Sequence, residues 1–167
     1  MPEKRTLKRA RRDKRQGKSA STQAGEFVRE EMHHIREGKH GAKNTKQAIA
    51  IGLSKARRSG VKLRAPKRGK ASAKTRKSAA RDYRTGQRTH GRKAVSARRS
   101  RASLRRLKKY GKSAASKKNL SKQARSSARR RTATDRSRAA RAASRTKGPA
   151  ARSRAAKKAA RTRKRKA

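Results

Sequence analysis

The chain contains no cysteine and no tryptophan, and it has very few aromatic side chains. Its 167 residues include one Phe and two Tyr. Without cysteine, neither a disulfide framework nor a thiolate metal site can form. Protein modules that recognise single-stranded RNA use aromatic side chains as stacking platforms for bases. The shortage of aromatics therefore argues against such a module.

Large apolar side chains are also scarce. Leu, Ile, Val and Phe account for 13 of the 167 residues, and the hydrophobic fraction of 29% consists mostly of alanine. A chain with less than about 20% of these four residue types and a high net charge is expected to be largely disordered. A catalytic domain with a packed core and a closed pocket needs more apolar surface than this. We therefore predict that the protein is not an enzyme and that it has no cofactor.

Acidic residues are the third shortage. The chain has 8 Asp and Glu against 59 Lys and Arg, so its net charge is +51. A chain of this charge repels itself and attracts polyanions, of which nucleic acid is the commonest inside cells. Because duplex DNA carries one charge per ~1.7 Å, full neutralisation would cover about 25 base pairs. The charge predicts a nucleic-acid partner.

The sequence also has no apolar run of the length that a secretory signal or a membrane span requires. We therefore expect the protein to stay where it is made, in the cytoplasm and associated with the nucleoid. We expect no membrane partner.

Charge and apolar content divide the chain into three parts. The net charge is +7 over residues 1–20, +6 over 21–64 and +38 over 65–167, whereas large apolar residues concentrate in 21–64. We predict a basic disordered arm at 1–20, a helix-loop-helix segment at 21–64 and a largely disordered Ala/Arg/Lys/Ser-rich tail at 65–167. The predicted fold class is a mostly disordered chain with a small all-α helical hairpin.

The first helix of the hairpin is expected to begin at a cap on Ser21 or Thr22 and to end near Glu37. Its apolar stripe has helical spacing and comprises Ala24, Val28, Met32 and Ile35. Gly38 is the predicted stop signal, because glycine adopts the left-handed conformation that ends many helices. Glu26, Glu30 and Glu31 lie near the helix start, where the dipole favours negative charge.

The second helix is expected to run from Lys46 to about Arg58, capped by Asn44 or Thr45. Its apolar stripe comprises Ile49, Gly52, Leu53 and Ala56, and Gly60 is the stop. Gly52 carries no side chain and would let another helix approach closely. Because so few apolar residues support it, we predict that the hairpin is marginal alone and gains order as a homodimer or on nucleic acid.

The tail consists mainly of good helix formers, but its like charges oppose helix formation in free solution. We therefore expect a coil that becomes partly helical on nucleic acid. The favoured tail helix spans 103–110, and Gly111 and the Gly148-Pro149 pair are the predicted interruptions.

Clusters of Lys and Arg are the predicted phosphate contacts, because clustered cations are the usual electrostatic footprint of a nucleic-acid-binding chain. They comprise Lys8, Arg9, Arg11, Arg12, Lys46, Lys55, Arg57, Arg58, Arg98, Arg99, Arg105, Arg106, Lys108, Lys109, Arg129, Arg130, Arg131, Arg161, Arg163, Lys164, Arg165 and Lys166. Reading of bases requires side chains placed in a groove by a rigid element. Only the 46–58 helix could serve, so we predict binding that is largely independent of sequence.

Two histidines lie four residues from a glutamate on the first predicted helix. Glu30 and His34 form one such pair, and His33 and Glu37 form the other. A metal site is the alternative interpretation, but helix-surface ion pairs are the expected one. We assign no catalytic, cofactor-binding or metal-ligating residue from the sequence.

Three stretches of the hairpin resemble a family of small, very basic bacterial proteins. They are Ser21–Glu31, Ile35–Gly41 and the run Gln47-Ala48-Ile49-Ala50-Ile51-Gly52-Leu53-Ser54-Lys55-Ala56-Arg57-Arg58. Members of that family are often labelled DNA-binding or plasmid stabilisation proteins. The resemblance implies a bacterial, nucleoid-associated protein without a known active site. The tail is similar in composition to the tails of linker histones.

The sequence thus predicts a non-enzymatic, histone-like protein that neutralises phosphates and compacts or bridges duplex DNA. Two alternatives stay open. One is an RNA- or ribosome-associated basic protein, and the other is a plasmid-maintenance interaction module tethered to DNA by its tail.

Overall fold

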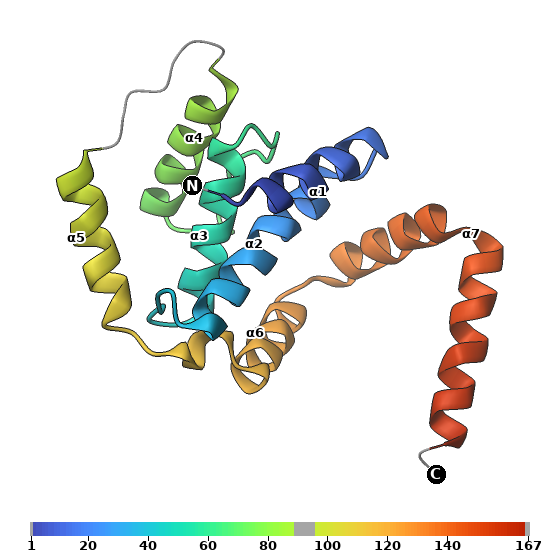
Figure 1. Cartoon of the computed structure of the whole chain (residues 1–167). Helices are drawn as coiled ribbons and strands as arrows, with labels where there is room; N and C mark the ends of the chain where they lie inside the picture. The colour runs from blue at the N-terminus through green and yellow to red at the C-terminus, as the bar shows by residue number, and fades with distance from the viewer. Residues whose placement is uncertain (1, 89–95, 166–167) are drawn as a thin grey trace. The chain divides into compact units, whose positions relative to one another are not determined.

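Alanine, arginine and lysine are strong helix formers, and most described residues of the chain that they dominate are helical. The computed structural model describes residues 2–88 and 96–165, and 76% of the described residues are helical. The elements are α1 (Lys4–Arg15), α2 (Ala20–Glu37), α3 (Thr45–Arg58), α4 (Ala73–Gln87), α5 (Ala97–Lys108), the 3₁₀ turn η1 (Lys112–Ala115), α6 (Lys117–Arg129) and α7 (Ala133–Lys164) (Figure 1).

The prediction of a mostly disordered chain is therefore wrong. Helix α1 lies in the arm at 1–20, and α4 to α7 lie in the tail at 65–167. The physical reason is that alanine builds much of the core. Among the described residues, eight of the twelve buried apolar ones are alanines, namely Ala10, Ala24, Ala42, Ala48, Ala56, Ala79, Ala114 and Ala115. A core of this kind is missed by a count of Leu, Ile, Val and Phe, because that count leaves alanine out. Small side chains let helices pack closely, so fewer methylene groups suffice to exclude water.

Side-chain caps fix where the helices begin. Asn44 Oδ1 accepts a hydrogen bond from the Gln47 N–H at 2.8 Å, as predicted for α3. The cap of α2 is Ser19, two residues before the predicted Ser21, and its Oγ accepts from the Thr22 N–H at 3.3 Å. The end of α2 is Gly38 in the left-handed conformation, with φ of 80°.

Helices α1 to α4 form a sequential array, in which each packs against the next along the chain (Figure 1). Helices α2 and α3 approach closely where Gly52 faces Val28. A Cβ atom at position 52 would lie 2.7 Å from the Val28 Cα atom. The predicted role of Gly52 as a site of close helix approach is confirmed.

Two apolar clusters hold this array together. The first joins α1, α2 and α3 with the segment that follows α3, and it comprises Ala10, Ala24, Phe27, Ala56 and Val61, flanked by Leu7, Ala20, Leu53 and Leu63. Helix α1 and the segment after α3 thus cover apolar side chains of the α2–α3 hairpin. The homodimer expected through 21–64 stays a prediction.

The second cluster includes residues of the segment that was predicted to be a disordered tail. It comprises Met32, Ile35, Ala42, Ala48, Ala114 and Ala115, flanked by Val28, Ile49 and Leu120. Two hydrogen bonds fasten η1 to the hairpin. The Thr45 Oγ1 donates to the Ala114 carbonyl at 2.7 Å, and the Arg36 Nε donates to the Ala115 carbonyl at 3.0 Å. Residues about 70 positions apart in the sequence therefore share one core.

Helix α7 lies in a separate compact unit of residues 124–167, and none of its described side chains is buried. Its backbone departs from helical geometry at Gly148, where φ is 62°, directly before Pro149. The predicted interruption at Gly148-Pro149 is thus present as a kink. In the part of the chain that the structure describes, no helix is both long and apolar enough to cross a membrane.

Candidate nucleic-acid interface

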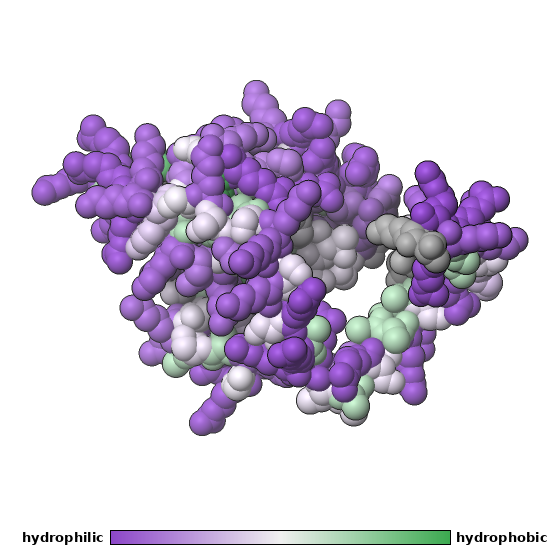
Figure 2. All heavy atoms as spheres, turned by 90° about the horizontal axis from the view of Figure 1, so that it is seen from below, coloured by the Kyte–Doolittle hydropathy of each residue, from purple (hydrophilic) through white to green (hydrophobic). Residues whose placement is uncertain are grey.

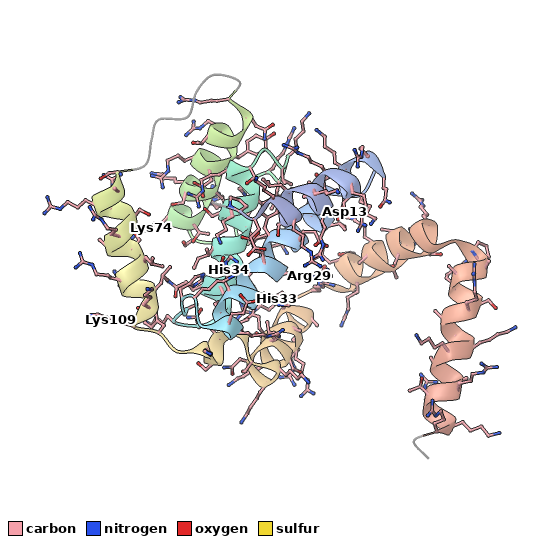
Figure 3. All side chains as sticks on the ribbon, in the orientation of Figure 1. Asp13, Arg29, His33, His34, Lys74 and Lys109 are labelled. Carbon is pink, nitrogen blue, oxygen red and sulfur yellow. The ribbon has the colours of Figure 1, made fainter. Side chains whose placement is uncertain are left out.

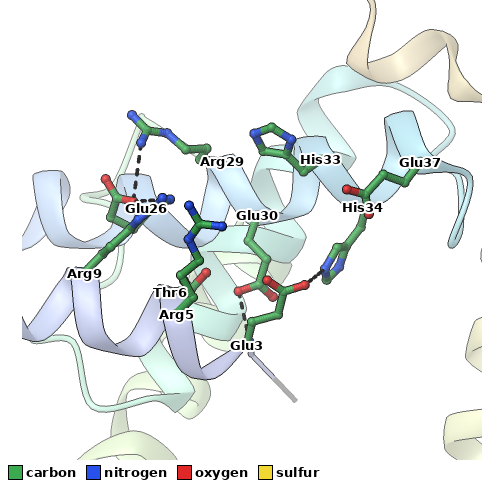
Figure 4. A pocket seen from close by; sticks show the side chains of 10 residues that line it. All are labelled: Glu3, Arg5, Thr6, Arg9, Glu26, Arg29, Glu30, His33, His34 and Glu37. Atoms are coloured by element: carbon green, nitrogen blue, oxygen red, sulfur yellow. Dashed lines mark hydrogen bonds and ion pairs between the residues drawn. The ribbon is translucent and has the colours of Figure 1, made fainter.

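Most of the acidic residues lie on α2 or at the start of α1, where they pair with cations of α1 and α2, of the loop after α2 and of α3. Four of them, Glu3, Glu26, Glu30 and Glu37, line a groove between α1 and α2 with a volume of about 440 Å³ (Figure 4). Glu26 contacts both Arg9 and Arg29 at 3.7 Å. The Glu3 backbone N–H donates to Glu30 Oε2 at 3.2 Å. Glu26 and Glu30 thus stabilise the contact between α1 and α2.

The histidines of α2 make different contacts from the predicted helix-surface pairs. His34 Nε2 lies 2.8 Å from Glu3 Oε1 across the α1–α2 boundary, rather than facing Glu30. His33 is exposed, and its ring points away from the Glu3–His34 pair (Figure 4). The hydrogen bond from His34 is the main cause that lowers the pKa of the Glu3 carboxyl.

The α2 C-terminus carries a further ion pair. Lys39 Nζ lies 2.9 Å from Glu37 Oε2. This hydrogen bond lowers the pKa of the Glu37 carboxyl and raises the pKa of the Lys39 amine, because it favours the charged form of each partner.

Two of the predicted phosphate contacts on α3 are used inside the molecule. Lys55 Nζ lies 2.7 Å from Glu31 Oε2 and 3.5 Å from Glu30 Oε1, and both glutamates are buried. Arg57 is buried and its Nε donates to the Leu63 carbonyl at 3.1 Å. Burial also lowers the pKa of Arg57. Neither side chain is free to reach a phosphate.

The other predicted contacts are distributed over several elements. Lys8, Arg11 and Arg12 on α1 are exposed, as are Lys46 and Arg58 on α3, whereas Arg9 is half-buried beside Glu26. Arg129 ends α6, and Arg130 and Arg131 follow it. Arg161, Arg163 and Lys164 lie on α7, with Arg165 as its C-cap. Lys166 lies outside the described residues.

Helix α5 carries the densest group of predicted contacts. Arg98, Arg99, Arg105, Arg106 and Lys108 are exposed along it, and Lys109 is its C-cap (Figure 3 labels Lys109). None of its residues is buried, and it packs against no other described helix. A shallow hollow along one side is lined by Arg98, Arg101, Leu104, Arg105 and Lys108. Their spacing of three or four residues places them on one face of the helix.

Helix α4 carries a similar cationic face that the sequence analysis did not single out. It comprises Lys74, Lys77, Arg81 and Arg84 and lines a second shallow hollow (Figure 3 labels Lys74). The opposite side of α4 packs on α3, where Ser54 Oγ donates to Asp82 Oδ2 at 2.6 Å. The signal was present as cations three or four residues apart, but it is visible only once 73–87 is known to be helical.

Exposed cations therefore dominate the helices after α3. Residues 65–167 hold 40 Lys and Arg against two acidic residues, Asp82 and Asp135. Asp82 faces Ser54, and Asp135 lies in the first turn of α7. On the face drawn in Figure 2, hydrophilic side chains cover most of the visible surface and apolar colour is confined to small areas. This arrangement suits an extended anion better than a small molecule.

Residues 14–68 match a family of unknown function (DUF6496). No curated protein and no solved structure matches the chain. Because only this family of unknown function is found, two assignments made from the sequence are wrong. They are the resemblance of the hairpin to DNA-binding or plasmid stabilisation proteins and the resemblance of the tail to linker-histone tails. Likewise, the description of the protein as intrinsically disordered is wrong, because its elements are ordered helices. The matched segment spans α2 and α3 and leaves out the cationic helices α4 to α7.

Proposed function

We propose that this protein binds duplex DNA through the phosphate backbone and largely independently of sequence. The observation that carries the proposal is the separation of charge within the fold. Carboxylates of α1 and α2, including the α1 N-cap Glu3, are paired or buried, whereas cations on α4 to α7 are mostly exposed and far outnumber acidic neighbours. A carboxylate on a DNA-facing surface would repel phosphates, so this separation favours a polyanionic partner.

The geometry of α5 supports a duplex as the partner. The helix is 12 residues long, which corresponds to about 18 Å at 1.5 Å per residue. The major groove of B-DNA is about 12 Å wide and admits an α-helix. An α-helix with cations on several sides can contact the phosphates of both groove walls. Arginine and lysine contacts of this kind position a protein without selecting a sequence.

Neutralisation of phosphates follows from such binding, and nucleoid DNA is the partner that we propose. Cations on α7 and on the α4–α5 segment belong to two different units of the chain. If each unit contacts its own stretch of duplex, the second contact is intramolecular and gains from a high effective concentration. Compaction or bridging of DNA is therefore part of the proposal.

The test is a salt titration of the affinity for a 30-base-pair duplex, with a structured RNA as competitor. Each phosphate contact contributes about −0.9 to the slope of log K against log salt. The variant Arg98→Gln/Arg101→Gln/Arg105→Gln removes three exposed cations and keeps good helix formers in place. We expect its slope to be shallower by about 2.7.

The matched control removes the same number of charges where each cation faces a glutamate. Arg9→Gln/Arg29→Gln/Lys39→Gln should change the slope by clearly less, because these cations are paired with Glu26 or Glu37. Equal changes in both variants would refute the view that charge separation sets the interface. Stronger binding to the RNA than to the duplex at matched salt would replace duplex DNA with structured RNA as the partner.

A further inference from the structure

The turn between α2 and α3 brings two histidines next to a buried glutamate. Glu31 and His34 are three residues apart on α2 and so share a helix face. Gly38 ends α2 in the left-handed conformation, and the reversed chain places His40 against the same face. We propose that Glu31, His34 and His40 form a binding site for a divalent transition metal of the Zn²⁺ type. One potential ligand atom of each residue lies within 4.8 Å of the other two.

The hydrogen-bond partners of the His40 ring carry the argument. Its Nδ1 lies 3.1 Å from the Gly41 carbonyl oxygen, which can only accept, so Nδ1 bears a hydrogen. Its Nε2 lies 3.2 Å from Glu31 Oε1. In a neutral imidazole that nitrogen presents a lone pair, so two electron-rich atoms would face each other. A cation between them removes this conflict.

The distance between His40 and Glu31 also suits such a cation. Zn²⁺ binds imidazole nitrogen and carboxylate oxygen at about 2.0–2.2 Å with tetrahedral angles, which separates neighbouring ligand atoms by about 3.3 Å. The His40 Nε2 to Glu31 Oε1 separation is 3.2 Å. Histidines that bind metals commonly donate their other ring N–H to a backbone carbonyl. The contact of His40 Nδ1 with Gly41 has this form.

Glu31 has one oxygen available for the metal. The residue is fully buried, and Oε1, like Oε2, receives no hydrogen bond from any described residue. Its other oxygen, Oε2, is held by Lys55 Nζ at 2.7 Å. A carboxylate that binds a metal through one oxygen and a protein donor through the other is well oriented. Glu3, 2.8 Å from His34 Nε2, fixes the second histidine ring in a similar way.

This assignment differs from the ion pairs predicted from the sequence. The predicted pairs joined Glu30 to His34 and His33 to Glu37, whereas the structural group uses Glu31 and recruits His40 from the loop. Three protein ligands leave a fourth tetrahedral position for a water molecule. The proposal does not depend on DNA binding.

The experiment uses the full-length chain, freed of nucleic acid and of metals. It is titrated with Zn²⁺ by calorimetry and with Co²⁺ by visible absorption. We expect one equivalent of each metal and the strong visible bands of tetrahedral Co²⁺. His34→Ala and His40→Ala should each weaken binding by at least about 10-fold, since even loss of an outer-shell partner costs 10–100-fold.

The control is His33→Ala, which removes an exposed histidine beside the site and should leave the affinity unchanged. No saturable binding, or an equal loss with His33→Ala, would overturn the proposal.

If the site variants fail to fold, NMR of the histidine rings in the unmutated chain gives the answer. Addition of Zn²⁺ should shift the ring signals of His34 and His40 but not those of His33. If the His40 ring instead carries hydrogens on both nitrogens and does not respond to Zn²⁺, a second proton satisfies Glu31 and the metal site is refuted.

Discussion

Substitution of Gly52 by alanine separates two effects that oppose each other at the α2–α3 contact. Alanine is a better helix former than glycine by about 1 kcal/mol, so the substitution favours α3 by itself. The new Cβ would, however, lie 2.7 Å from the Val28 Cα and 3.0 Å from its Cγ2. The nearer atom belongs to the backbone and cannot rotate away, so the two helices must move apart.

The packing effect should be the larger of the two. Overpacking of a well-packed core costs about 1–3 kcal/mol. Gly52→Ala separates α2 from α3, which carry members of both apolar clusters, so we expect the upper part of this range. After subtraction of the gain in helix propensity, the free energy of unfolding should fall by about 1–2 kcal/mol. Such a loss lowers the Tm of the compact unit of residues 1–123, which contains both helices, by about 4–8 °C.

Gly25 provides the matched control. It lies within α2, and a Cβ atom there would meet nothing within 4 Å. Gly25→Ala should therefore raise the free energy of unfolding by about 0.5–1 kcal/mol. Urea denaturation followed by circular dichroism at 222 nm measures both variants. If Gly52→Ala stabilises the protein as much as Gly25→Ala does, then α2 and α3 do not approach as closely as the structure indicates.

Three further predictions concern other parts of the chain. A Cβ atom at Gly41 would overlap the Tyr110 carbonyl oxygen, so Gly41→Ala should detach η1 and accelerate amide hydrogen exchange over 112–120. Contacts in the folded state lower the pKa values of Glu3 and Glu37 below the ordinary 4.5, so their contribution to stability is present above that value and is lost as the pH falls through the folded-state values. The free energy of unfolding, measured by urea denaturation at pH 7 and pH 3.5, should therefore differ less between the two pH values in Glu3→Gln/Glu37→Gln than in the unmutated chain. An equal difference would show that these contacts do not contribute to stability. Removal of 133–167 should leave the Tm of the remainder within about 2 °C, because the described side chains of α7 are not buried, but it should reduce the salt slope of DNA binding.

The sequence predicted the α2–α3 hairpin because its large apolar residues repeat at helical spacing between capping residues and glycines. It did not predict α1 or η1 as parts of the core. Ala114 and Ala115 are indistinguishable in the sequence from the many exposed alanines of the tail, yet they are almost fully buried. They are buried because they pack in one cluster with residues of α2 and α3 such as Ile35 and Ala48, and a single sequence carries no information on such distant partners.

The candidate interface was predicted in part. A cluster of cations such as that around Arg105 is visible without a fold, because exposure is the usual state of a charged side chain. The ion pair of Lys55 and the burial of Arg57 could not be seen, since they depend on Glu31 and on the Leu63 carbonyl facing α3. For the same reason the proximity of His40 to Glu31 could not be predicted from the sequence.

The alanine-rich core has a consequence for how stability varies with temperature. The heat-capacity change on unfolding grows with the apolar area that becomes exposed, and an alanine side chain contributes only one methyl group. We expect this change to lie below the usual 12–15 cal/mol/K per residue. A small heat-capacity change flattens the curve of unfolding free energy against temperature, so the protein should lose little stability on cooling and unfold over a broad range on heating.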